Sequence, residues 1–414
     1  MIIGNVEIYD SEKTLLEQID FIDSQIADWR EKIFSESSAV INVATLFSGI
    51  GSIEHALSRL NINHNIVFAG DIDKHCKETY FANYAISEDR WHSDITKFSA
   101  KKYKYKVDLL VGGSPCQAFS MVGHRRGLED TRGTLFYDFA RIVSECKPKI
   151  FIYENVKGLL NHDSGKTWLV VKEVFKELGY KIYTKTLNSK DYGIPQHRER
   201  LFVVAFRDKN IEFEFPKKVD LQHTMQDFLE DYTDSKYYLR DKGVKFVTST
   251  WNKNKRYTQI NGDIALCQKA NQQFNWHGDF VFEKIGLQDH YDTFIFNVND
   301  VEEKYYLSEK VHKYVLAGGT KSFKTSHETD LTVARPLLQS MHKMHRAGVD
   351  NYVTHNKGRI RKLTPRECLR LMGFRDDFKI VTSDTQMYRQ AGNSIVADVL
   401  IAILMQMDIT KFGR

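Results

Sequence analysis

The sequence predicts an α/β protein in which a parallel sheet carries helices on both faces and a smaller, irregular β-containing domain is inserted. Between residues 40 and 216, short apolar runs alternate with amphipathic stretches, the pattern of a doubly wound sheet. From residue 217 to 357 this alternation is lost, and it returns from 358 to 414. We therefore expect the last segment to complete the domain that residues 40–216 begin.

Each predicted element rests on its own run of residues. The apolar runs that predict strands are residues 41–47, 65–71, 107–113, 149–155 and 200–206, and the stretches that predict helices are residues 53–60, 135–145, 167–178 and 394–407. Residues 1–39 predict an acidic helical extension. Its apolar stripe consists of Leu15, Ile19, Ile22, Ile26, Trp29 and Ile33. We expect that stripe to pack on the protein's own body; a surface for a partner is the alternative.

Composition restricts the class of protein. The chain has 414 residues, of which 42% are hydrophobic and 27% charged, as in ordered globular proteins. No apolar run is long enough to span a bilayer, and the five cysteines form no C-x-x-C pair. We expect a cytoplasmic protein without a disulfide framework or a bound metal. Residues 1–40 carry nine acidic and three basic side chains, so the remainder is basic, which mildly favours a polyanionic partner.

A glycine turn follows the first predicted strand. In NVATLFSGIGSIE, Gly49 and Gly51 allow a sharp bend before a helix, where a ligand can approach the backbone closely. The next strand ends in Asp71, which can accept hydrogen bonds from ribose hydroxyls. A dinucleotide fingerprint would have a third glycine where Glu54 stands, and a carboxylate there would repel a pyrophosphate. These residues therefore predict a nucleoside ligand without phosphates at this turn, which S-adenosylmethionine fits better than NAD.

Two reactive side chains follow two other predicted strands. Cys116 lies in the loop GGSPCQAFS, and Glu154 ends the strand IFIYEN. Because neighbouring parallel strands end at the same edge of a sheet, we expect both side chains to share one pocket. Taken singly, a packed loop thiol and a helix N-cap are the simpler interpretations. Their combination favours a catalytic thiol beside an acid.

The chain resembles the DNA cytosine-5 methyltransferases of the bacterial restriction–modification type. The motifs that carry this resemblance occur in the family's order: LFSGIGSIE, GGSPCQAFS, GLEDTRGTLF, YENVKG, GIPQHRERLFVV, RKLTPRECLRLMGF and QAGNSIVADVL. The resemblance implies a Rossmann-like, S-adenosylmethionine-dependent methyltransferase sheet. Residues 217–357 would form the family's target-recognition domain.

The resemblance also implies roles for individual residues. Cys116 would attack C6 of a flipped cytosine while Glu154 contacts N3. Arg200 would contact the carbonyl oxygen of the base, and Arg198 would hold the active-site loop or a phosphate. The base that removes the C5 proton is not identified by the sequence.

For the cofactor, the resemblance implies contacts around the glycine turn. Phe47 would stack on adenine, Gly49 and Gly51 would form the close turn, and Asp71 would bind the ribose. The remaining expected contacts are Ile72, Asp94, Ile95 and Asn393. Asp71 is one methylene shorter than the family's usual glutamate, and Ser52 replaces a common glycine. Asn393 and Ser394 could also simply cap the final helix.

Double-stranded DNA is the expected partner, with the protein acting as a monomer. We expect Gln117, Ser120 and Arg132 in the nucleophile loop, and Lys343 and Arg346 in SMHKMHRAG, to contact DNA. A solvated basic loop is an equally good interpretation of the latter pair.

Three other functions remain open at this stage. An RNA cytosine methyltransferase would share the catalytic parts. A catalytically inactive DNA-binding protein would not need Cys116, Glu154 and the arginines intact. An amino-methyltransferase would need an Asn/Asp-Pro-Pro-aromatic loop, which the sequence does not contain. Neither the DNA site nor the existence of a companion restriction enzyme can be derived from these residues.

Overall fold

The computed structural model describes most of the predicted catalytic body and smaller parts of the remaining chain. The described residues are 29–36, 38–115, 135–230, 305, 330–337, 351–355 and 359–414, with two-residue strands at 2–3, 6–7, 259–260, 279–280, 319–320 and 323–324. The main helices are α2 (Ser52–Arg59), α3 (Lys74–Asn83), α4 (Leu135–Cys146), α5 (Lys166–Glu177), α9 (Pro365–Arg370), α10 (Asp384–Asn393) and α11 (Ala397–Gln406).

A six-stranded sheet organises the body, and its strand order is β4-β3-β5-β6-β8-β7. Its strands are β3 (Ile41–Leu46), β4 (His64–Phe68), β5 (Leu109–Gly112), β6 (Ile150–Val156), β7 (Lys181–Asn188) and β8 (Glu199–Phe206). All five predicted strands are present, and β7 is an additional one at the edge.

The sheet is mixed, so the prediction of a parallel sheet is wrong for one side. Strands β4, β3, β5 and β6 pair in parallel, whereas β8 is antiparallel to both β6 and β7. The physical reason is the short link of residues 189–198 between β7 and β8, since parallel neighbours need a long crossover. As a result, the start of β8 meets the carboxyl end of β6: Val156 lies opposite Arg200.

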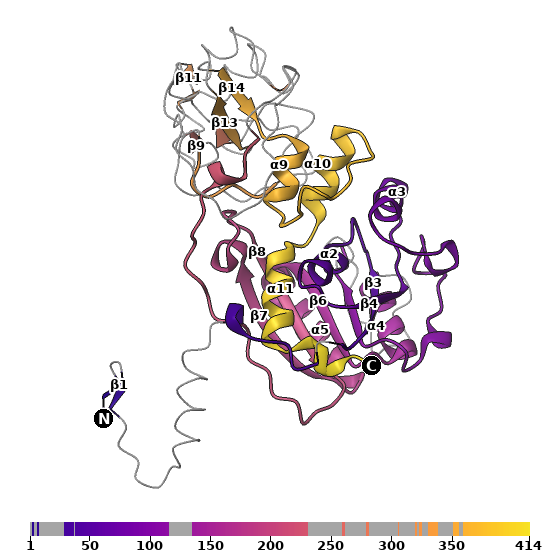
Figure 1. Cartoon of the computed structure of the whole chain (residues 1–414). Helices are drawn as coiled ribbons and strands as arrows, with labels where there is room; N and C mark the ends of the chain where they lie inside the picture. The colour runs from indigo at the N-terminus through magenta and orange to yellow at the C-terminus, as the bar shows by residue number, and fades with distance from the viewer. Residues whose placement is uncertain are drawn as a thin grey trace.

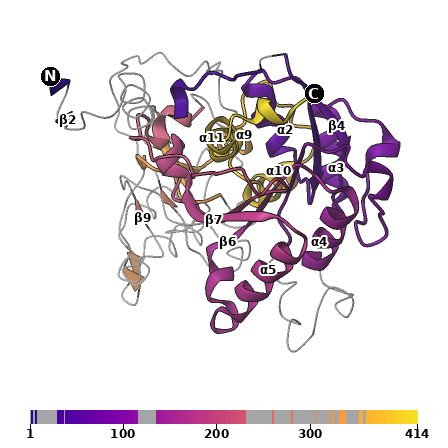
Figure 2. The ribbon, with the colours of Figure 1, turned by 90° about the horizontal axis from the view of Figure 1, so that it is seen from below.

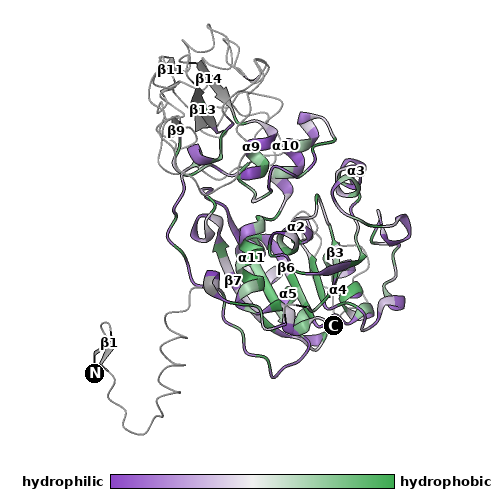
Figure 3. Cartoon of the chain, viewed as in Figure 1, coloured by the Kyte–Doolittle hydropathy of each residue, from purple (hydrophilic) through white to green (hydrophobic). Residues whose placement is uncertain are grey.

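Helices cover both faces of the sheet, as the alternation of apolar runs predicts. Figure 2 shows α4 and α5 on one side of the strands, with α2, α10 and α11 on the other. Successive strand residues divide accordingly between two buried clusters. Val43, Val111 and Ile152 pack with α2 and α11, whereas Ala44, Leu110 and Phe151 pack with α4 and α5. Figure 3 shows the resulting apolar interior along the strands and α11.

The end of the chain returns to the first strand of the sheet. Helix α11 packs against α2 across more than 300 residues of sequence. At the terminus, the amide of Arg414 donates to the carbonyl of Val40 (3.1 Å), and the amide of Val40 donates to the carbonyl of Arg414 (2.9 Å). These contacts attach the last segment to the body that residues 40–216 form.

Beyond α9 and α10, seen from the sheet, lies the antiparallel pair β13 (Tyr352–His355) and β14 (Arg359–Lys362) (Figure 1). The smaller strand pairs are β1 (Ile2–Ile3) with β2 (Val6–Glu7), β9 (Gln259–Ile260) with β10 (Asp279–Phe280), and β11 (Gly319–Thr320) with β12 (Phe323–Lys324). The predicted domain boundaries remain predictions.

Only the end of the predicted N-terminal helix lies among the described residues. Trp29–Glu31 form a single 3₁₀ turn, η1, and Trp29 is buried, its indole N–H donating to the carbonyl of Lys217 (3.0 Å). Ile33 is 91% exposed, so the last member of the apolar stripe does not pack on the body as expected. Leu15, Ile19, Ile22 and Ile26 lie outside the described residues. Within the described chain, no helix combines the length and apolarity that a membrane span requires.

Candidate active site

The glycine turn connects β3 to α2 through three left-handed backbone conformations. Phe47, Gly49 and Gly51 have φ angles of 54°, 54° and 82°. A side chain on Gly51 would overlap the ring of Tyr84, whose hydroxyl donates to the Gly51 carbonyl (2.8 Å). Phe47 holds its positive φ without being a glycine, which stores strain of the kind found at ligand sites. Beside Gly49, by contrast, a Cβ would meet nothing within 4 Å, so the turn is open to a ligand at that residue.

Asp71 closes this turn from the neighbouring strand. Its Oδ2 accepts from the Gly49 amide (3.0 Å), and its Oδ1 accepts from the Asp73 amide (2.9 Å). Burial raises the pKa of Asp71, with both amides opposing the shift. Each carboxylate oxygen retains a second lone pair, so the acid can hold the turn and still accept from a hydroxyl.

The other residues expected to contact adenine surround the end of β4. Ile72 is 83% exposed beside Asp71, and Phe47 is half-buried against the α4 face. Asp94 accepts from the amide and hydroxyl of Thr96 (3.1 and 2.7 Å). Ile95 is buried. The segment before Asp94 is tied to β4, since the amide of His92 donates to the carbonyl of Ala69 (2.8 Å).

Asn393 is brought to this region by the last turn of α10, where its side chain is exposed. Two residues of the preceding turn attach α10 to the cofactor side of the body. Arg389 forms an ion pair with Asp73 (3.5 Å), and Gln390 accepts from the hydroxyl of Thr79 (3.0 Å). Residues near the C-terminus thus lie beside the segment that carries Asp71.

Glu154 and Arg200 face one another at the carboxyl end of β6. Arg200 Nε lies 3.1 Å from Glu154 Oε1, and the two side chains are only 15% and 14% exposed. Burial raises the pKa of Glu154, although the positive charges of Arg200 and Arg198 oppose this shift. A carboxyl group with a raised pKa can keep a proton for donation to a ligand.

The turn after β5 passes directly over this carboxyl group. A Cβ on Gly113 would lie 2.7 Å from the carbonyl oxygen of Glu154 and 2.9 Å from its Oε2. The turn is fixed by Asn155, whose side-chain amide donates to the Ser114 carbonyl (2.9 Å), and by the 2.7 Å contact between the hydroxyls of Ser114 and Tyr153. Glycine at 113 is therefore required by close approach.

Cys116 itself lies outside the described residues, which stop at Pro115 before resuming at Leu135. The last described residues before it, Gly113 to Pro115, begin directly over the carboxyl group of Glu154. The predicted pairing of Cys116 with Glu154 stays a prediction. The predicted DNA contacts of Gln117, Ser120, Arg132, Lys343 and Arg346 also lie outside the described residues.

Arg198 has two backbone partners that the resemblance does not imply. Its Nη2 donates to the carbonyls of Gly392 and Ser394 (both 2.9 Å), and the residue is 4% exposed. The guanidinium thus joins the residue before β8 to the end of α10, and its expected role at the active-site loop or a phosphate stays a prediction. Its place in the structure is that of a positioning residue for the segment carrying Asn393.

Sequence reasoning missed the residues that support the site from behind. Ser114, Tyr153 and Asn155 fix the nucleophile turn, and only their position beside Glu154 and Cys116 could have indicated this. Gln196 is fully buried; its side chain donates to the Leu371 carbonyl (2.8 Å) and accepts from the Leu337 amide (3.3 Å). It ties the start of β8 to residues 331–337 and to α9.

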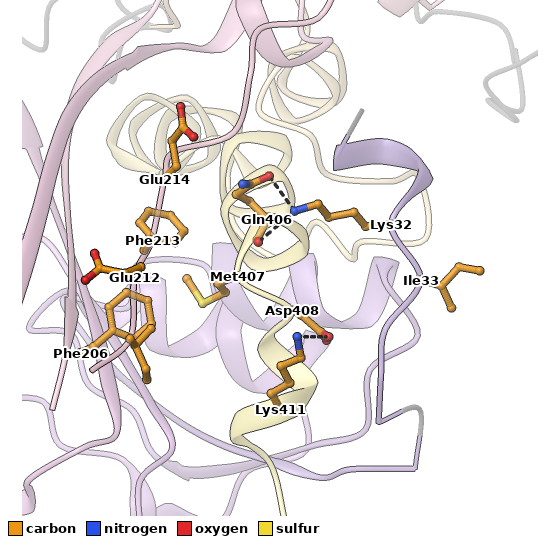
Figure 4. Close-up of a pocket in the computed structure, with 11 residues that line it drawn as sticks. Lys32, Ile33, Phe206, Glu212, Phe213, Glu214, Gln406, Met407, Asp408 and Lys411 are labelled. Atoms are coloured by element: carbon orange, nitrogen blue, oxygen red, sulfur yellow. Dashed lines mark hydrogen bonds and ion pairs between the residues drawn. The ribbon is translucent and has the colours of Figure 1, made fainter. Parts of the chain in front are cut away.

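A separate cavity of about 420 Å³ lies at the opposite edge of the sheet. It is lined by Phe206, Phe213 and Met407, with Lys32, Asp408 and Lys411 among its charged residues (Figure 4). Phe206 ends β8, the strand whose start carries Arg200. This cavity is therefore remote from the glycine turn and from Glu154. Among the described residues, no cluster of His, Cys, Asp and Glu suits a metal ion.

The sheet order and the two loops at its carboxyl edge define a Rossmann-like methyltransferase fold. The crystal structure of S. pombe Dnmt2 methyltransferase shares this fold, with a TM-score of 0.58 at 19% sequence identity, covering 89% of this chain and 98% of that one.

Residues 41–408 match the model of the C-5 cytosine-specific DNA methylases, and the chain belongs to that family. The chain is 33% identical to the orphan methyltransferase M.SPRI of Bacillus phage SPR, covering 90% of this chain and 99% of that protein. It is also 33% identical to the Type II methyltransferase M.HhaI of Haemophilus parahaemolyticus, covering 86% of this chain and 90% of the relative. The predictions of family, fold and enzyme class are thereby confirmed.

Proposed function

We propose that this enzyme methylates C5 of cytosine within a specific short sequence of duplex DNA, using S-adenosylmethionine, base flipping and a covalent bond between Cys116 and C6. Names of similar proteins, including the Type II methyltransferase M.HhaI, support a role as the modification enzyme of a restriction–modification system. The observation that carries the proposal is the largely buried Glu154–Arg200 pair beneath the turn that leads to Cys116.

Cytosine C5 is a weak nucleophile, so the enzyme must add electron density to the ring. The thiolate of Cys116 forms a bond to C6 and directs an electron pair toward C5. Glu154 donates a proton or a hydrogen bond to N3, which keeps negative charge from accumulating on the ring. Its burial supports this role, because burial favours the protonated form. Arg200, whose Nε lies 3.1 Å from the acid, would donate to the carbonyl oxygen of the base.

After C5 has taken up the methyl group, a base must remove the proton from C5. The electron pair of that C–H bond restores the double bond between C5 and C6, and the bond between C6 and sulfur breaks. Cys116 then leaves as a thiolate, and a proton that Glu154 has given to N3 returns to its carboxylate. Because C6 is inaccessible in a stacked duplex, the cytosine must first leave the helix.

When bound, S-adenosylmethionine supplies an electrophilic methyl group on a sulfonium. The residues present suit its nucleoside, since a Cβ on Gly49 would meet nothing within 4 Å and Asp71 keeps acceptor capacity for a ribose hydroxyl. Phe47, Ile72, Asp94, Ile95 and Asn393 would complete the site. Arg198 would act on it indirectly, by holding the segment of Asn393.

The test is transfer of labelled methyl groups to duplex DNA by Cys116→Ala and Cys116→Ser. We expect both variants to be inactive, with Cys146→Ala, at the opposite edge of the sheet, as the matched control. Duplex DNA containing 5-fluorocytosine should trap wild-type enzyme covalently, because fluorine cannot leave as a proton does. Activity in the Cys116 variants, or no trapped adduct at a methylated site, contradicts the mechanism. Methylation-aware sequencing of the treated DNA identifies the site.

A further inference from the structure

A buried carboxyl group lies directly behind the glycine turn. Glu54, the third residue of α2, is fully buried. Its Oε1 accepts from the hydroxyl of Tyr80 on α3 (2.5 Å) and from the hydroxyl of Thr45 on β3 (3.1 Å). Its Oε2 is buried and accepts no hydrogen bond from another residue in the described part of the chain. Buried carboxyl oxygens are normally satisfied, so this one requires an explanation.

The hydrogen bonds of Glu54 continue to the residues expected to hold the nucleoside. Thr45 Oγ1 lies 2.7 Å from Ser48 Oγ, and Ser48 Oγ accepts from the Gly70 amide (2.8 Å). Gly70 precedes Asp71, which accepts from the Gly49 amide (3.0 Å). A continuous chain of short contacts therefore joins Glu54 to the turn and to its acid.

The carboxyl group of Glu54 gains or loses its proton close to neutral pH. Burial raises its pKa to about 7, while the Tyr80 hydroxyl, its own amide and the Thr45 hydroxyl oppose the shift. The titratable groups that face it are Tyr80 of α3 and Tyr84, the residue after α3, whose pKa values burial raises well above 10. Neither tyrosine can therefore supply a charge near pH 7.

Other charged groups near Glu54 are already engaged. On α2 itself, burial lowers the pKa of His55 to about 3, and Arg59 is paired with Asp398 of α11 (2.6 Å). Asp71, beyond β4, is the other acid in the chain of contacts; it is partly buried and holds two amides. A positive charge entering at the turn would find Glu54 without a cationic partner in the described structure.

We propose that Glu54 is a positioning residue of the cofactor turn, and that it loses its proton when the cationic methyl donor binds in front of that turn. This inference rests on the proposed function. A nearby positive charge favours the ionised carboxylate. The demethylated product has a neutral thioether in place of the sulfonium, so it would leave Glu54 protonated. The enzyme would then distinguish donor from product partly through this proton.

Isothermal titration calorimetry of the full-length protein, in buffers of different ionisation enthalpy, tests the proposal without measuring activity. For S-adenosylmethionine we expect release of roughly half a proton at pH 7 and an association constant that weakens below pH 7, by up to about tenfold per pH unit. For S-adenosylhomocysteine we expect little release and a flat profile over the same range.

Three variants separate positioning from bulk stability. Glu54→Gln keeps both hydrogen-bond acceptor contacts, so it should bind the donor with a flat pH profile and without proton release. Tyr80→Phe removes a hydrogen-bond donor that lowers the pKa of Glu54. The pH below which binding of the methyl donor weakens, called the pH step here, should therefore move upward. Thr45→Ser keeps the hydroxyl and should leave the step in place.

The outcomes distinguish the two proposals. A pH step and proton release that persist in Glu54→Gln, or that are equal for donor and product in the wild type, overturn the role of Glu54 while leaving the cofactor assignment standing. Absence of donor binding at every pH overturns the cofactor assignment and the role of Glu54 with it. A step that is specific to the donor and lost in Glu54→Gln supports the proposal.

Discussion

Replacing Gly113 by alanine tests whether the turn after β5 and the carboxyl of Glu154 form one site. The added Cβ would lie 2.7 Å from the Glu154 carbonyl oxygen and 2.9 Å from Oε2, closer than carbon and oxygen atoms approach without a bond. The backbone oxygen belongs to a central strand and cannot swing aside, so the turn must move. The φ angle of Gly113 lies outside the left-handed range, which leaves steric overlap as the cause.

The expected magnitude follows from that overlap. Overpacking of this kind costs about 1–3 kcal/mol of unfolding free energy. A displacement of the nucleophile by roughly 1 Å lowers activity about 100-fold, equivalent to about 2.7 kcal/mol of transition-state stabilisation. Gly158→Ala is the matched control, because its Cβ would meet nothing closer than Val156 at 4.0 Å.

Two measurements check this prediction: urea unfolding, and kcat/KM for transfer of labelled methyl groups to DNA. We expect Gly113→Ala to lose far more activity than Gly158→Ala. If Gly113→Ala remains within about twofold of the wild type in kcat/KM, the turn and the acid do not act as one site and our reasoning is refuted.

Three further predictions concern buried charges. Glu154→Gln should lower kcat by about 10²–10⁴-fold in methyl-transfer assays, because the amide cannot pass a proton to N3; near-normal kcat would remove Glu154 from the mechanism. Because the folded pKa of Glu54 is raised from 4.5 to about 7, wild-type stability should fall as pH rises through this window, by roughly 3 kcal/mol. Urea unfolding of Glu54→Gln should lack that fall, and equal profiles would contradict the shift. Arg198→Lys should lose about 1–3 kcal/mol in the same assay, since lysine cannot reproduce the two bonds of Nη2; unchanged stability would argue against its positioning role.

The strands and helices of the body were predictable because their apolar patterns are local. The runs at residues 41–47 and 149–155 correspond closely to β3 and β6, and the stretch 135–145 corresponds to α4. The direction of β8 was not predictable in this way. An apolar run has the same composition whichever way it points, and only the short link after β7 determines that Arg200 enters the site from the opposite direction.

The site residues show the same division. Gly49, Gly51 and Asp71 were identifiable because a glycine turn and an acid at a fixed spacing have a direct physical purpose. The hydrogen bonds of Arg198 could not be identified in this way, because the carbonyls of Gly392 and Ser394 that it binds lie almost 200 residues away in the sequence.

Local chemistry along the chain thus accounts for the fold class, the ligand turn and the choice of reactive side chains, since each depends on residues adjacent in sequence. Three-dimensional packing alone establishes that Glu154 lies largely buried against Gly113 and is paired with Arg200. It also establishes that one carboxyl oxygen of Glu54 is buried behind the turn without a hydrogen-bond partner among the described residues. The reason is that desolvation and close approach arise between segments distant in sequence. These effects raise the pKa values on which the proposed chemistry depends.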